Sequence, residues 1–181
     1  VITGIATAAL DSIPMVIITG QVRQPVIGTN AFQEVNTIGI SRPVTKHNYL
    51  VKKLENIPRI IKEAFYIAQT GRPGPVLIDI PVDIQTSFTK EKLETETVRH
   101  GYNPVQSIED KDIKEAWAMI KHSTRPLIYA GGGVILSNGS EELIKFAEKT
   151  GIPVATTLLG LGCIPENHSL SLGMLGMHGH Y

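Results

Sequence analysis

Apolar residues in the first half of the chain follow two patterns, one typical of helices and one typical of buried strands. Helical spacing, with apolar residues three and four positions apart, occurs over 2–10 and again over 57–70. Short apolar runs occur at 14–20 (PMVIITG) and 75–81 (PVLIDIP), and we expect both to be buried strands. Helices that alternate with buried strands indicate an α/β fold with a parallel sheet.

The helix over 57–70 has the clearest boundaries. Its apolar face is formed by Ile57, Ile60, Ile61, Ala64, Phe65, Ile67 and Ala68. Pro58 suits the first turn, and Gly71 is a suitable stop because glycine adopts the left-handed conformation without a Cβ penalty. Arg72 then lies between this helix and the strand at 75–81, where the ordinary interpretation is a solvated turn arginine that pairs with a nearby carboxylate.

The segment 21–41 has no sustained hydrophobic period. Pro25, Gly28 and Gly39 interrupt it, so we expect irregular structure with at most a short helix around Ala31–Glu34. Irregular segments of this length inside a compact domain often carry function. The sequence therefore predicts a site in this part of the chain.

A polar stretch divides the chain into two halves. Residues 86–107 are charge-rich and show no period, so we expect an interdomain linker in which the charged run Lys90–Glu96 is simply solvated. Beyond it, strand, glycine loop, helix and strand follow one another as in half of a nucleotide-binding fold. The expected elements are a helix over 109–122 with Ile113, Ala116, Trp117 and Ile120 on its apolar face, a strand over 126–134, a helix over 140–151 with Ser140 as its N-cap, and a strand over 153–160.

Glycines follow three short apolar segments in the second half of the chain, at 131–133, 156–162 and 173–179. They let backbone N–H groups approach a ligand closely, and a helix N-terminus favours a negative group such as a pyrophosphate. In a doubly wound sheet such segments meet at the carboxyl ends of the strands, where ligands bind. The spacing at 131–133 is not GxGxxG, and a structural tight turn is an equally good interpretation there. Three such strand ends in one domain nevertheless favour a bound nucleotide.

Composition and charge narrow the classes of function. The 181 residues contain 17 Lys+Arg and 17 Asp+Glu, so no electrostatic surface for nucleic acid or an anionic membrane is expected. No apolar run is long enough to span a bilayer. Cys163 is the single cysteine and cannot form an internal disulfide, which is compatible with a reducing compartment.

The sequence contains no pattern typical of a metal centre or of an activated nucleophile. Neither a G-x-S-x-G nor a Walker A motif occurs. His178 and His180 are close in sequence but lack a third ligand. Each of the six histidines is expected to be a surface or hydrogen-bonded residue: His47, His100, His122, His168, His178 and His180.

Six motifs, taken together and in order, closely resemble the catalytic large subunit of acetolactate synthase (acetohydroxyacid synthase), a thiamine-diphosphate-dependent enzyme family. They are LDSIPMVIITGQV, IGTNAFQE, TKHNYLV, GRPGPVLIDIPVDIQ, TTLLGLG and LGMLGMHG. The resemblance implies a transferase that joins two pyruvates, or pyruvate and 2-ketobutyrate, with release of CO2 in branched-chain amino-acid biosynthesis. It further implies thiamine diphosphate, FAD and Mg²⁺ as cofactors, a homodimer or homotetramer, a regulatory small subunit, and a cytoplasmic location, or a plastid one in a plant.

The same resemblance implies how the chain is divided. Residues 1–85 would be the C-terminal part of the parallel-sheet domain that binds the thiamine pyrimidine, 86–107 the linker, and 108–181 the first part of a Rossmann-like central FAD domain. The glutamate that protonates the cofactor would precede Val1, and the domain that holds metal and diphosphate would follow Tyr181. On this interpretation both ends are cuts in a longer protein, and the chain alone has no catalytic or metal-binding residue and no activity.

Carried over position by position, the resemblance also implies functional residues. Gln33 would lie beside thiamine diphosphate, while Phe32 and Lys46 would line the substrate channel. Arg72 would reach the flavin from its turn. Further FAD contacts would come from Ser12, Gly132, Thr157, Leu158, Leu175, Gly176, Met177 and His178.

Two alternatives remain open at this point. One is another FAD-containing thiamine enzyme, of the glyoxylate carboligase or pyruvate oxidase type. The other, from a different class, is a non-catalytic nucleotide-binding or assembly module.

Overall fold

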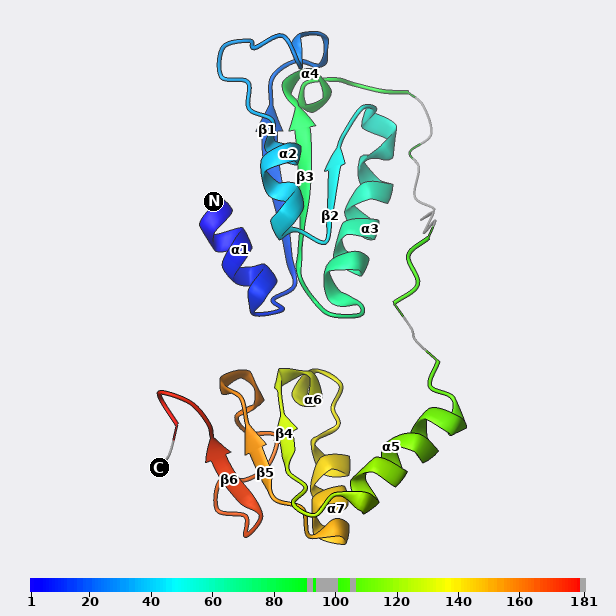
Figure 1. Ribbon diagram of the computed structural model, residues 1–181. Helices are drawn as coiled ribbons and strands as arrows, with labels where there is room; N and C mark the ends of the chain where they lie inside the picture. Colours follow the sequence, from blue (N-terminus) through cyan, green and yellow to red (C-terminus); the bar gives the residue numbers. More distant parts are fainter. Residues whose placement is uncertain (91–92, 94–100, 105–106, 180–181) are drawn as a thin grey trace. The chain divides into compact units, whose positions relative to one another are not determined.

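The chain forms two compact units, Val1–Gln106 and Ser107–Tyr181, in the computed structural model (Figure 1). The structure describes residues 1–90, 93, 101–104 and 107–179. Each unit contains a three-stranded parallel sheet, so the α/β class is confirmed. Much of the expected linker and of its charged run, together with His100 and His180, lies outside the described residues. Within the described residues, no helix is both long and apolar enough to cross a membrane.

The sheet of the first unit has the order β1-β3-β2. Its strands are β1 (Met15–Gln21), β2 (His47–Leu50) and β3 (Pro75–Pro81). The central strand β3 is buried along nearly its whole length, which confirms the expectation for 75–81. The strand expected at 14–20 is present, but its predicted burial was wrong. β1 pairs only with β3 among the described residues, and Ile18 is 61% exposed.

Helices and short turns connect these strands. The helices are α1 (Ile2–Leu10), α2 (Thr37–Ser41), α3 (Ile57–Gln69) and α4 (Val82–Gln85), and the 3-10 turns are η1 (Gln24–Val26), η2 (Arg42–Val44) and η3 (Leu54–Asn56). α3 agrees closely with the predicted helix, and Gly71 follows it with φ +60°. Ile60, Ala64 and Ala68 pack with the strands in the core, but Phe65 was wrongly placed on that face and is exposed.

α3 also buries a charged residue, Glu63, against β2. Arg59 donates to the Glu63 carboxylate at 3.0 Å, and the Tyr49 hydroxyl donates to it at 3.1 Å. Burial together with the carboxylate raises the pKa of the Tyr49 hydroxyl. Arg59 and Tyr49 together supply the hydrogen bonds that a charge buried in an apolar interior requires.

Two elements of the first unit, α2 and β2, were not predicted. The short helix expected around Ala31–Glu34 is a turn instead. The helix of this segment is α2, and at its start the Asn36 side chain accepts from the Gly39 N–H at 2.8 Å. β2 has a polar sequence, HNYL, and no apolar alternation that indicates a strand. It is a strand because it pairs with β3, which local sequence does not reveal.

The second unit has the sheet order β4-β5-β6. Its elements are α5 (Asp110–His122), β4 (Ile128–Ala130), α6 (Gly132–Leu136), α7 (Ser140–Thr150), β5 (Val154–Thr156), the 3-10 turn η4 (Leu158–Gly160) and β6 (Ser171–Met174). A small core joins α7 to the strands through Ala147, Val154 and Ile164.

Three expectations for this unit need correction. The strands expected over 126–134 and 153–160 are only three residues long, because the chain turns into α6 and η4 at their ends. Ser140 is the first residue of α7 rather than its N-cap. The expected apolar face of α5 is largely open to solvent, with Trp117 45% exposed and its ring edge against Phe146.

Close packing explains why a glycine is needed at position 160, in η4. A Cβ at Gly160 would overlap the carbonyl oxygen of Ala130. We expect Gly160→Ala to destabilise the second unit by about 1–3 kcal/mol, because backbone must move to admit the methyl group. Gly133→Ala is the matched control, since nothing lies within 4 Å of a Cβ there. Urea unfolding followed by the fluorescence of Trp117, the single tryptophan, measures both, and equal stability of the two variants would contradict the packing argument.

Candidate functional site

The first unit has a cavity, lined by both polar and apolar residues, at the carboxyl ends of its strands. Its volume is about 390 Å³. Gln21, Leu50 and Asp79 line it from the three strands, and the other lining residues come from the loop over 27–36 and from the first two residues of α2. Ligands of parallel α/β sheets bind at this edge.

The loop that covers the cavity has an unusual backbone, held by one carboxylate. Gln33 adopts φ +64° and Asn30 φ +58°, a left-handed conformation that side chains other than glycine seldom take. The Glu34 carboxylate accepts from the N–H groups of Gly28 and Ala31, the latter at 3.0 Å. These amides, Gly28 foremost, hold the pKa of the Glu34 carboxyl below its ordinary value. Phe32, at the tip, is 90% exposed.

The lowered pKa of Glu34 has a direct consequence for pH dependence. The ionised form of Glu34 accepts the two amide hydrogen bonds and so stabilises the loop. Its contribution to stability is therefore fully present above pH 4.5, the ordinary pKa, and is lost as the pH falls through the lowered pKa of the folded chain. We expect the amide proton signals of Gly28 and Ala31 to titrate together below pH 4.5. Glu34→Gln should abolish this titration. A midpoint at or above the ordinary glutamate value would show that the amides do not stabilise the carboxylate.

At the base of the cavity lies Asp79, a fully buried carboxylate on β3. Its two oxygens accept from Thr19 Oγ1 at 2.6 Å and from Gln21 Nε2 at 3.0 Å. Sequence reasoning did not single out Asp79, Gln21 or Glu34. The available signal was the single charge inside the apolar run PVLIDIP, which a buried strand tolerates only with dedicated partners.

A second cavity, of about 260 Å³, lies at the amino ends of β2 and β3. Lys46 and Arg72 line it together with Pro43–Thr45 and Pro73–Pro75. Arg72 Nε donates to Ser12 Oγ at 2.8 Å, and Nη2 donates to the carbonyl of Leu10 at 3.0 Å. The structure therefore brings together two residues expected to contact FAD, and the bonds to Ser12 and the end of α1 replace the carboxylate partner of the ordinary interpretation.

Lys46 is bound to protein oxygens. Its ammonium donates to the carbonyls of Ile67 and Thr70 at the end of α3, the latter at 2.7 Å, and to the Tyr102 hydroxyl at 3.1 Å. Its backbone N–H donates to Pro75 at the start of β3, which places it at the amino edge of the sheet. Phe32 belongs to the loop at the carboxyl edge, so the structure does not bring the two expected channel residues together.

The expected flavin residues of the second unit do lie at one edge. Gly132 follows β4, Thr157 and Leu158 follow β5, and 175–178 follow β6. Because the three strands are parallel neighbours, their carboxyl ends meet. Met177 is 91% exposed.

The glycine loop at 131–133 differs from the expected phosphate site. α6 is only five residues long, so no long helix begins there. A Cβ at Gly132 would lie 3.0 Å from the Leu159 Cβ, which supports the tight-packing interpretation of this glycine. Among the described residues, no group of three His, Cys, Asp or Glu side chains could hold a metal ion.

Comparison with known proteins places this arrangement in context. The chain is 54% identical over 182 residues to the acetolactate synthase large subunit of Buchnera aphidicola subsp. Schizaphis graminum, covering 99% of this chain and 32% of that protein. Along nearly its whole length, the chain is similar to acetolactate synthase large subunits. It is also 51% identical to the isozyme 1 large subunit of Escherichia coli (98% of this chain, 31% of that protein) and 50% identical to the probable large subunit of Methanococcus aeolicus (98% and 30%).

The similarity to acetolactate synthase confirms the resemblance carried by the six motifs. Residues 113–181 also match the family described as thiamine pyrophosphate enzyme, central domain. This match begins inside the second unit and extends to Tyr181. The chain spans about a third of the length of the curated relatives it matches.

Proposed function

We propose that this chain is a segment of an acetolactate synthase large subunit, which joins two pyruvates, or pyruvate and 2-ketobutyrate, with release of CO2. About half of its residues are identical to those of the relatives over nearly its whole length, and this observation carries the proposal. A homo-oligomer, a regulatory small subunit and a cytoplasmic or plastid location follow from this assignment alone.

Thiamine diphosphate would be held against the carboxyl edge of the first unit, the proposed pyrimidine-binding part. A cavity lined by polar and apolar groups at that edge, and the left-handed turn that leaves Gln33 exposed beside it, fit such a planar, hydrogen-bonding group. When bound, the cofactor supplies an electron sink for the acyl carbanion left by decarboxylation. Gln33 would donate or accept a hydrogen bond at the cofactor, and the exposed Phe32 ring would exclude water from the reacting carbon.

FAD would be held at the carboxyl edge of the second unit, the proposed central FAD part at 108–181, and a flavin contact for Arg72 in the first unit, the proposed part at 1–85, is a separate prediction of the resemblance. Two observations support flavin binding: the small residues after β4, β5 and β6 share one edge, and Arg72 retains donors for a ligand. The described bonds of Arg72 engage Nε and Nη2, while a guanidinium has five N–H donors. We assign no described side chain to Mg²⁺, because no cluster among the described residues fits a metal.

A chimeric enzyme tests the proposal. The corresponding segment of the Escherichia coli isozyme 1 large subunit, to which this chain is 51% identical, is replaced by residues 1–181. We expect the chimera to form acetolactate from pyruvate, and Gln33→Ala to abolish this activity without lowering its melting temperature.

The control is the unmodified Escherichia coli subunit assayed in parallel. A folded chimera that fails to form acetolactate, or that prefers glyoxylate to pyruvate, would contradict the proposal. Preference for glyoxylate would favour the carboligase alternative instead.

A further inference from the structure

The buried carboxylate of Asp79 is connected to the loop over the cavity. Asp79 lies on the central strand β3 and is fully buried, and a buried ion pair or carboxylate is weak evidence for stability because desolvation offsets its bonds. An apolar residue would suit a central strand better. The position therefore calls for a role that an apolar side chain cannot fill.

Gln21 provides the connection. Its Nε2 group donates both to Asp79 Oδ2 at 3.0 Å and to the carbonyl of Val35 at 2.7 Å. Its Oε1 atom accepts from the Val22 N–H at 2.8 Å. An ionised carboxylate only accepts hydrogen bonds, so Asp79 dictates which end of the Gln21 amide faces the loop.

The loop that Gln21 holds contains the expected cofactor residue. Val35 is two residues beyond Gln33, whose backbone is left-handed, and Glu34 ties the preceding turn to Gly28 and Ala31. Gln33 thus lies between two anchored positions, Ala31, which is bonded to Glu34, and Val35, which is bonded to Gln21. Between Gln33 and the start of α2, the bond from Gln21 to the Val35 carbonyl is the one described hydrogen bond that joins this loop to the sheet.

We propose that Asp79 and Gln21 are positioning residues: the buried carboxylate orients the Gln21 amide, which fixes the 28–35 loop and with it the position of Gln33, an exposed residue next to Glu34 of the cavity wall. That the ligand is thiamine diphosphate rests on the proposed function. The tie between sheet and loop does not rest on it, because it follows from the hydrogen bonds alone.

Thr19 offers a matched control. Its hydroxyl bonds the other oxygen of the same carboxylate, Asp79 Oδ1, but Thr19 has no described bond to the loop. Thr19→Val therefore removes one bond to Asp79 and leaves the connection to Val35 intact. Gln21→Met keeps the length of the side chain and removes the connection.

Hydrogen exchange of the chain tests the tie. In Gln21→Met and in Asp79→Asn, we expect the amides of residues 28–35 to exchange about 10-fold faster, as for loss of the neutral hydrogen bond between Gln21 and Val35. Thr19→Val should leave their exchange unchanged. Unchanged exchange in Gln21→Met, or equal acceleration in Thr19→Val, would overturn the proposal. Gln21→Met leaves the core intact, so the test does not depend on whether Asp79→Asn folds.

Cofactor titration of the chimera tests the positioning role. We expect Gln21→Met to weaken the apparent affinity for thiamine diphosphate about 10-fold and to lower kcat, and the double variant with Asp79→Asn to be no weaker than the single ones. Thr19→Val should match the unsubstituted chimera. A loosened loop with unchanged cofactor affinity would overturn the positioning role, whereas an inactive unsubstituted chimera would count against the proposed function and leave the exchange result standing.

Discussion

Replacing Lys46 with methionine should lower the free energy of unfolding of the first unit by about 2–4 kcal/mol. The ammonium donates to two carbonyls in the last turn of α3, Ile67 and Thr70, and to the Tyr102 hydroxyl, over whose ring it also lies at 5.6 Å. A cation at a helix C-terminus is favourable, and its loss removes the charged donor and leaves these two carbonyls to the Tyr102 hydroxyl, which reaches Thr70 at 2.9 Å and Ile67 only at 3.5 Å. Urea unfolding followed by far-ultraviolet circular dichroism measures the change.

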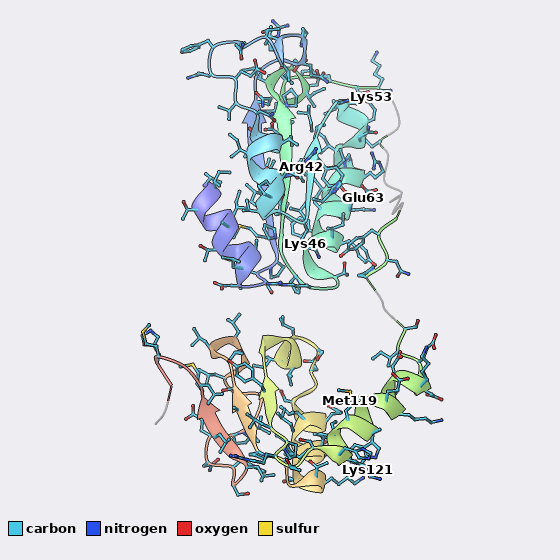
Figure 2. All side chains as sticks on the ribbon, viewed as in Figure 1. Arg42, Lys46, Lys53, Glu63, Met119 and Lys121 are labelled. Carbon is cyan, nitrogen blue, oxygen red and sulfur yellow. The ribbon has the colours of Figure 1, made fainter. Side chains whose placement is uncertain are left out.

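Lys53→Met is the matched control for Lys46→Met. Lys53 is an exposed lysine of the same unit, and Figure 2 shows it far along the unit from Lys46. Its replacement should change stability little, as for most surface substitutions. Equal stability of the two variants, with acetolactate formation lost only in Lys46→Met of the chimera, would instead favour the substrate-channel role that the resemblance implies for Lys46.

Arg72→Ala should weaken FAD binding by the chimera about 10- to 150-fold, as for one hydrogen bond from a charged donor worth roughly 1.5–3 kcal/mol. Lysine at this position should restore the affinity only in part, because one ammonium cannot reproduce a planar fork of donors. A flavin titration of the apoenzyme measures the affinity. A thermal melt should show a small loss of stability as well, since Arg72 also binds the end of α1 through Leu10.

Arg42→Ala is the control for Arg72→Ala. Arg42 is an exposed arginine in η2 of the same unit (Figure 2), and its loss should change neither flavin affinity nor the melting temperature. If Arg72→Ala lowers the melting temperature and leaves FAD affinity unchanged, Arg72 is a structural turn residue that caps α1.

Periodic segments of the sequence predicted the elements that they form. α1, α3 and α7 follow the helical spacing of their apolar residues, and β3 follows its continuous apolar run. Helices ended where glycines permit a left-handed residue, at Gly71 and Gly151. Predictions of this kind succeed because the period of burial and the backbone preferences of glycine act over a few neighbouring residues.

The candidate site was only partly accessible from the sequence. The irregular segment 21–41 does cover a cavity, and the expected flavin positions after β4, β5 and β6 share an edge. The roles of Gln33, Phe32 and the flavin residues came from the resemblance and stay predictions. Thr19 and Gln21, the hydrogen-bond partners of Asp79, are about 60 residues away from it along the chain, and no local sequence pattern predicts such contacts.

The sequence by itself determined the α/β class, the boundaries of the long helices and the central strand, and the similarity to acetolactate synthase. Tertiary structure alone decided the rest. It made HNYL a strand by pairing it with β3, left β1 at an edge, drew the Lys46 ammonium to the end of α3, and joined Asp79 through Gln21 to the loop that carries Gln33. Spacing along the chain encodes burial within one element, whereas the partner of a strand edge or a buried charge depends on which distant segments the fold brings together.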